Sequence, residues 1–127
     1  MAHFNAVQIT QRLKRDLNIP ILWGGIHPTI RPQECLDYAD LICLGEGEEA
    51  LVELVKKIEE GQDYRHIPGI WARDKNNIIT NEIRPLIQDL DSVPFPDYYD
   101  YENHYILDGK YIKKMSEALL DKYCLGH

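Results

Sequence analysis

The chain has 127 residues, with 14 Lys and Arg against 21 Asp and Glu, and a formal net charge of −7 at pH 7. Nucleic acids and anionic membranes attract clustered positive charge, so this acidic balance argues against both as main partners. No apolar run reaches the roughly 20 residues of a membrane-spanning helix. No signal peptide is visible, so we expect one domain in the cytosol.

The first third of the chain predicts helices alternating with short strands. A helix over about residues 4–17 and a strand near residues 21–23 come first. A short helix from Arg31-Pro32 to about Tyr38 and a strand over residues 41–44 follow. Spacings of three and four place one apolar face on the first helix, through Ala6, Ile9, Leu13 and Leu17.

The clearest helix is expected over residues 48–60. Acidic residues precede it, Lys56 and Lys57 lie near its end, and Gly61 terminates it, as the helix dipole and capping preferences favour. Its expected apolar face consists of Ala50, Leu51, Leu54, Val55 and Ile58.

The pattern changes after Gly61. Residues 69–73 and 78–81 predict a β-hairpin around a polar turn, and Pro85 begins an extended linker that continues to Tyr99. A helix is expected over residues 110–123. We therefore predict an α/β fold in three parts: a partial doubly wound, Rossmann-like parallel sheet (1–62), a β-hairpin extension (63–84), and the linker with a C-terminal helix (85–127).

Two parallel strands are too few to bury both faces of such a sheet. We therefore expect either a fragment of a larger domain or a chain that completes its sheet by pairing with another copy, through an exposed sheet edge.

Each of the two strands ends in a glycine-rich loop. Gly24-Gly25 and then His27-Pro28-Thr29 follow the first strand, and Gly45-Glu46-Gly47 follows the second. Ligands of open α/β sheets bind beyond the carboxyl ends of strands, so the two loops predict one shared ligand edge. The alternatives are that the glycines only allow sharp turns and that the glutamates only favour a helix start.

Several kinds of site are disfavoured by the residues present. Glu46, Glu48 and Glu49 at the helix start disfavour a bare phosphate and favour hydroxyls, amides or an amine. There is no GxGxxG motif, no Walker lysine and no nucleophile–base set. His27 has no second ligand at a metal-like spacing, and the chain has no CxxC. We expect Cys43, Trp23 and Trp71 in the core.

Three segments together resemble one family. They are "ILWGGIHPT" (21–29), "ADLICLGEGEEALVELV" (39–55) and "NEIRPLIQDLDSVPFPDY" (81–98). They closely resemble the second half of the cobalamin-binding domain of B12-dependent radical SAM proteins, and its bridge to the radical SAM barrel. That group includes cobalamin-dependent methylases and the anaerobic magnesium-protoporphyrin monomethyl ester cyclases.

The resemblance implies that cobalamin is the ligand of the glycine edge. The residues that would contact the corrin edge and the nucleotide tail are Gly24, Gly25, His27, Thr29, Gly45, Glu46 and Gly47. We assign no cobalt ligand. The family's first half, its D-x-H-x-x-G motif and its CxxxCxxC loop are absent from this sequence. S-adenosylmethionine and the [4Fe–4S] cluster would therefore belong to a missing parent domain, and this chain alone is not expected to catalyse a reaction.

Two other functions remain open from the sequence. One is a self-associating scaffold or interaction fragment that no longer binds a cofactor. The other is a nucleotide-binding enzyme, which would need a phosphate loop that the sequence does not show.

Overall fold

The computed structural model describes residues 2–97 and 100–125, so Tyr98 and Tyr99 of the predicted linker lie outside it. The chain divides into two compact units, Met1–Leu90 and Asp91–His127. Among the described helices, none combines the length and apolarity that a membrane crossing demands.

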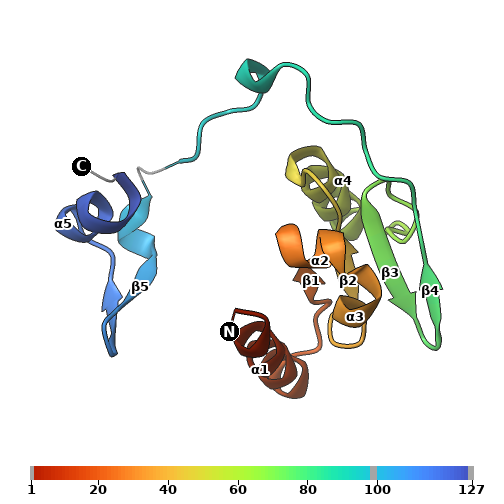
Figure 1. Ribbon diagram of the computed structural model, residues 1–127, viewed down its shortest axis with the longest axis horizontal. Coiled ribbons are helices and arrows are strands. Elements are labelled where there is room, and N and C mark those ends of the chain that lie inside the picture. Colours follow the sequence, from red (N-terminus) through yellow and green to blue (C-terminus); the bar gives the residue numbers. More distant parts are fainter. Residues whose placement is uncertain (1, 98–99, 126–127) are drawn as a thin grey trace. The chain divides into compact units, whose positions relative to one another are not determined.

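The first unit contains a four-stranded sheet with the strand order β1-β2-β3-β4 (Figure 1). The strands are β1 (Leu22–Trp23), β2 (Leu41–Cys43), β3 (Ile70–Asp74) and β4 (Asn77–Ile79). β1 pairs with β2 in parallel, and the other two pairings are antiparallel.

The predicted α/β class is confirmed, but the sheet is mixed rather than parallel. The expected β-hairpin, β3–β4, continues this sheet instead of following it, because β3 pairs along the free edge of β2, with Ile42 opposite Trp71. This pairing satisfies backbone groups of the buried β2 that would otherwise lack partners.

Four helices flank the sheet: α1 (Ala2–Asp16), α2 (Ile26–Ile30), α3 (Pro32–Leu36) and α4 (Glu48–Glu59). Three of them match the predicted helices. The sequence did not predict α2, which places His27, Pro28 and Thr29 in a short helix rather than a loop. Proline is tolerated there because the first turn of a helix needs no backbone donor from it.

The core consists of two clusters on opposite faces of β2. Leu41 and Cys43 face α4, whereas Ile42 faces α3. This alternation follows from the period of two along a strand. Cys43 is buried, as predicted, and Trp23 and Trp71 are partly buried against the cluster beneath α3.

The buried face of α1 differs from the predicted one. Thr10 is buried, and its hydroxyl accepts a 2.8 Å hydrogen bond from Trp23 Nε1. Ile9 and Leu17, expected in the core, are 59% and 48% exposed. The bond to the Trp23 indole is made by Thr10, so α1 presents Thr10 rather than Ile9 to the sheet.

The predicted apolar face of α4 is only partly covered. Ala50 and Leu54 are buried, whereas Leu51, Val55 and Ile58 are 48%, 45% and 42% exposed. The physical reason is the small extent of the sheet, since β1 at its edge has only two residues.

The second unit contains a two-stranded sheet of β5 (Tyr105–Asp108) and β6 (Tyr111–Lys114), followed by α5 (Glu117–Leu120). The helix predicted over residues 110–123 is therefore wrong in its first part. Gly109 has a φ of 67° and turns the chain back, so β6 pairs with β5. Short 3-10 and π-helical turns complete the chain: η1 (Leu90–Ser92), η2 (Tyr101–Asn103) and η3 (Asp121–Leu125).

Asp108 holds this second unit together. Its carboxylate accepts hydrogen bonds from Lys113 Nζ (2.5 Å), Lys122 Nζ (3.0 Å) and the Tyr123 hydroxyl (2.5 Å). These bonds, led by the one from Lys113, hold the pKa of Asp108 well below its usual range.

We predict that Ile70→Ala destabilises the first unit strongly. Ile70 is fully buried in β3, so its truncation removes apolar contacts and leaves a cavity, with a loss of about 2–5 kcal/mol in the free energy of unfolding. The control is Ile78→Ala in the neighbouring β4, where the side chain is 37% exposed and the loss is about 1 kcal/mol or less. Urea titration followed by tryptophan fluorescence compares the two, and equal losses would contradict this core.

Candidate ligand-binding site

The loops after β1 and β2 meet at one edge of the sheet and line an open pocket of about 470 Å³. The parallel pairing of β1 with β2 brings their carboxyl ends together. Five of the seven predicted site residues line this pocket: Gly24, Gly25, Gly45, Glu46 and Gly47. Leu22, Cys43, Glu48 and Leu51 complete its wall. The two glycine loops therefore share one open pocket at this edge of the sheet.

Thr29 joins the two loops rather than lining the pocket. Its hydroxyl donates a 2.9 Å hydrogen bond to the Gly25 carbonyl and accepts one of 3.1 Å from the Gly45 N–H. The hydroxyl's donor and one of its acceptor positions are thus used within the protein. In this structure Thr29 is a positioning residue for the loops, and α2 is the element that carries it.

Two of the glycines have backbone conformations that other residues rarely adopt. φ is 96° at Gly25 and 73° at Gly45. A Cβ on Gly45 would also lie 3.3 Å from Ile83 Cγ2, whereas a Cβ on Gly25 would meet open space. The need for sharp turns therefore explains both glycines in part. The same glycines leave a pocket wall of bare backbone, which lets a ligand approach closely.

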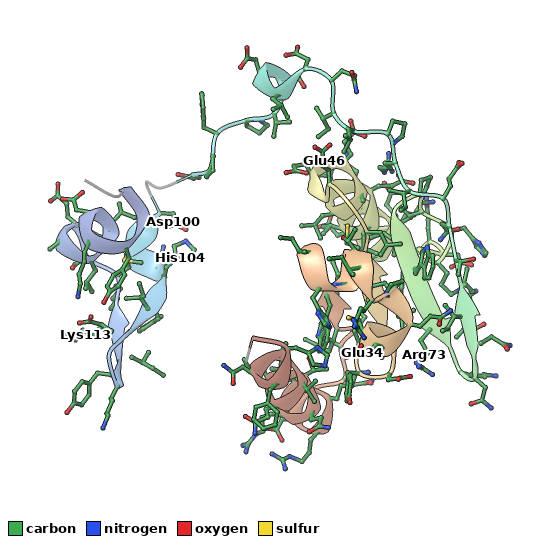
Figure 2. The ribbon with its side chains drawn as sticks, viewed as in Figure 1. Glu34, Glu46, Arg73, Asp100, His104 and Lys113 are labelled. Carbon is green, nitrogen blue, oxygen red and sulfur yellow. The ribbon has the colours of Figure 1, made fainter. Side chains whose placement is uncertain are left out.

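The acidic start of α4 is partly engaged by the protein itself. Glu46, which is labelled in Figure 2, accepts a 2.6 Å hydrogen bond at Oε2 from the Ile87 N–H. Its side chain therefore holds the segment after β4. Arg84 forms ion pairs with Glu49 and Glu53. Gly47 is the N-cap residue, and it makes no side-chain capping bond. Glu48 lies on the pocket wall together with Glu46.

The thiol of Cys43 also lies on this wall. Burial raises its pKa, the nearby Glu48 raises it further, and Arg84 opposes the shift. Cys43 is therefore a neutral thiol at neutral pH, which makes it a poor nucleophile.

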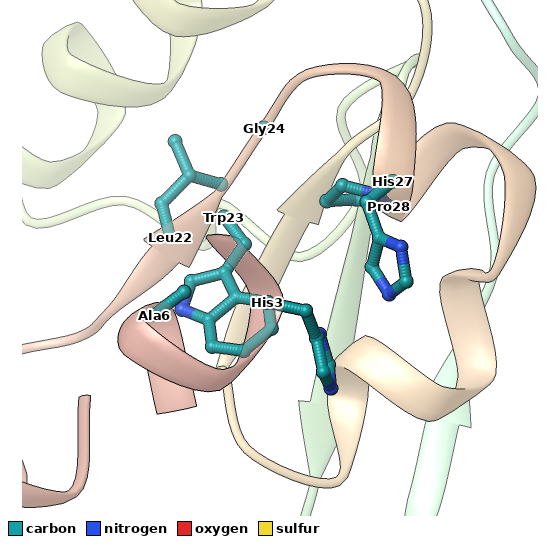
Figure 3. A pocket seen from close by; sticks show the side chains of 7 residues that line it. All are labelled: His3, Ala6, Leu22, Trp23, Gly24, His27 and Pro28. Carbon is teal, nitrogen blue, oxygen red and sulfur yellow. The ribbon is translucent and has the colours of Figure 1, made fainter. Parts of the chain in front are cut away.

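His27 lies on the other side of Gly24. It lines a second pocket of about 350 Å³ together with His3, Ala6, Leu22, Trp23, Gly24 and Pro28 (Figure 3). The ring centroids of His27 and His3 are 4.5 Å apart. Sequence reasoning missed His3, since nothing local in α1 marks it as a neighbour of His27.

A small α/β unit whose glycine loops form a pocket at the carboxyl ends of parallel strands has the arrangement typical of α/β ligand-binding domains. Comparison with known families identifies it further: residues 2–55 match the B12 binding domain. The match confirms the resemblance to B12-binding proteins that the motifs of this stretch indicate.

Curated relatives carry similar segments. An uncharacterized methyltransferase of Pyrococcus horikoshii is 33% identical over 85 residues, which are 64% of this chain and 18% of the relative. Anaerobic magnesium-protoporphyrin IX monomethyl ester cyclases are 38% identical over 81 residues in Cereibacter sphaeroides and 34% over 94 residues in Synechocystis. These matches cover 59% and 71% of this chain, and 13% and 19% of the cyclases.

The chain thus spans less than a fifth of the length of each of these relatives. No solved structure matches it.

We predict that Thr29→Val loosens the two glycine loops. Valine has the same shape but lacks the hydroxyl, so both hydrogen bonds of the hydroxyl are lost, at a cost of about 1 kcal/mol in stability. Amide hydrogen exchange at Gly45 should speed up. Thr29→Ser is the matched control, because it keeps the hydroxyl and should keep the protection. Unchanged protection of the Gly45 amide in the valine variant would contradict the bridging role.

Proposed function

We propose that the glycine-loop pocket is part of the cobalamin-binding surface of a B12-dependent radical SAM enzyme. The parent enzyme would perform methyl transfer or a related radical reaction. Its S-adenosylmethionine and [4Fe–4S] cluster would bind in another domain, so this chain alone binds the corrinoid and does not catalyse. The observation that supports this proposal most strongly is that the pocket falls within the stretch that matches the B12 binding domain.

The residues of the pocket fit one edge of the cofactor. Gly24, Gly25 and Gly47 offer bare backbone to a flat macrocycle, and Leu22 and Leu51 offer apolar contact. The Glu48 carboxylate can accept hydrogen bonds from the amide groups of a corrin periphery. A volume of about 470 Å³ suits a small-molecule site but is smaller than a whole cobalamin, so the pocket would hold only part of it.

Each residue has a distinct task in this proposal. When bound, cobalamin supplies the cobalt chemistry of the parent reaction. The glycine backbone and Glu48 orient the corrin edge, and Leu22 and Leu51 exclude water from it. Thr29 and Glu46 keep the loops in place through their hydrogen bonds to Gly45 and Ile87. Because the two pockets share Leu22 and Gly24, a ligand that extends past Gly24 reaches His27.

Titration of the 127-residue chain with hydroxocobalamin tests the proposal. We expect a saturable shift of the visible absorption, and at least a tenfold weaker affinity for Gly25→Val. The added side chain would point into open space on the pocket wall and obstruct the corrin edge.

Gly61→Val is the matched control for this titration. Gly61 also has a positive φ, of 66°, and open space at its Cβ position, but it follows α4 and lies outside the pocket. The affinity of this variant for hydroxocobalamin should be unchanged. A wild-type chain without any spectral shift at high protein concentration, or equal losses in both variants, would overturn the proposed site.

A second candidate function is self-association as a non-catalytic scaffold. Two observations favour it: β1 is an edge strand of the sheet, and α4 exposes Leu51, Val52, Val55 and Ile58. An exposed edge and an apolar helix face are both sites for pairing with a second copy. Sedimentation velocity should then show a concentration-dependent dimer that Val55→Lys dissociates. A stable monomer at all concentrations would exclude this function.

A further inference from the structure

Three metal-ligating side chains converge at one place outside the glycine pocket. They are His3 from α1, His27 from α2 and Cys35 from α3, and each offers one ligand atom within 4.8 Å of the others. Figure 3 shows that both imidazoles line one pocket, whose wall also includes Trp23 and Gly24. Three separate helices therefore deliver donors to one point.

Two ring nitrogens of this cluster have no hydrogen-bond partner. His3 Nδ1 and His27 Nε2 are buried and make no hydrogen bond. The imidazoles also pack against aromatic rings: His3 lies 5.7 Å from Trp23 and 5.9 Å from Tyr38 between ring centroids. Ring packing explains the position of the imidazoles but not the unsatisfied nitrogens, because buried polar atoms are nearly always hydrogen-bonded or bound to a metal.

The third donor, the sulfur of Cys35, is also buried. Cys35 is fully buried in the cluster beneath α3, and it is a free cysteine. Burial raises the pKa of its thiol, and the neighbouring Glu34 raises it further. A cysteine binds a metal as the thiolate, so a bound divalent cation would displace the proton of this thiol.

Glu34 lies where a supporting carboxylate is needed. Its Oε1 is 3.5 Å from His3 Nε2 and 3.9 Å from His27 Nε2, and Arg31 approaches its other oxygen at 3.5 Å (Glu34 is labelled in Figure 2). A carboxylate facing the second nitrogen of an imidazole fixes the tautomer in which the first nitrogen is free to bind a metal. Here that assignment leaves His3 Nδ1 as the ligand atom.

We propose that His3 Nδ1, His27 Nε2 and the Cys35 thiolate bind a divalent transition-metal ion of the zinc type, with Glu34 as the carboxylate that orients His3. Two imidazoles and a thiolate suit Zn²⁺, which takes three protein ligands and one water in an open tetrahedral site. Tetrahedral zinc places its ligand atoms roughly 3.5 Å apart, so small side-chain rotations close the present spacing. The ion would join α1, α2 and α3.

The proposal is independent of cobalamin, and its test uses metal alone. The chain, with Cys124→Ser as background, is freed of metal with a chelator and titrated with Co²⁺ as a probe for Zn²⁺. We expect one equivalent to bind, with the intense visible bands of tetrahedral cobalt and a thiolate-to-cobalt charge-transfer band. Zn²⁺ should then displace the cobalt and raise the melting temperature above that of the chelated chain.

Cys35→Ser should abolish the charge-transfer band. The matched control is Cys43→Ser, since Cys43 is also buried with a raised pKa but lies in the other core cluster. Its cobalt spectrum should equal that of the background chain. A band that survives Cys35→Ser, or that Cys43→Ser removes, would overturn the assignment.

His3→Gln provides a second readout if the Cys35 variant fails to fold. His3 lies near the start of α1 with its side chain 30% exposed, so its replacement should be tolerated. We expect at least a tenfold weaker Co²⁺ affinity. Unchanged affinity, or absence of cobalt binding by the background chain, would show that the imidazoles form only an aromatic cluster.

Discussion

The arrangement of the candidate site depends on a single hydroxyl group. β1 and β2 pair over only two residues each, Leu22 with Leu41 and Trp23 with Ile42, so the strands alone hold the following loops weakly. Thr29 adds the missing link, because it bonds to Gly25 in one loop and Gly45 in the other. A hydroxyl can donate and accept at once, so one short side chain fixes both loops. The pocket wall of bare backbone is then held open between them.

Much of the fold could be predicted because its signals are local. The helix α4, the two parallel strands and the glycine loops follow from apolar runs, charges and turn residues within short windows. Contacts between distant residues set the rest. The rotation of α1 depends on the bond from Trp23 to Thr10, the mixed sheet on the pairing of Trp71 with Ile42, and the β5–β6 hairpin on the turn at Gly109. The first two have no signature in their own segments. The third does, since Asp108-Gly109 is a typical hairpin turn, and the prediction of a helix there overlooked it.

The candidate sites likewise combine features that short stretches of sequence predict with features that depend on contacts between distant residues. Five of the glycine-loop residues line one pocket as expected, since parallel strands bring their ends together. The packing of Thr29 and Glu46 against the protein was not foreseeable, because their partners come from other elements. The donors His3, His27 and Cys35 lie on three helices, so no ligand spacing reveals them in the sequence. Gly24 borders both pockets, and the proposed corrinoid and metal sites are therefore neighbours on either side of β1.

The most direct test of the central claim is an amide-resolved NMR titration of the full chain with hydroxocobalamin. If the glycine loops hold the corrin edge, the amide signals of Gly24, Gly25, Gly45 and Gly47 shift together with one binding constant. The signals of Gly61 and Gly109, which lie outside the pocket, stay in place. Saturable binding that leaves the four loop glycines unshifted would contradict the account, and so would shifts confined to Gly61 and Gly109.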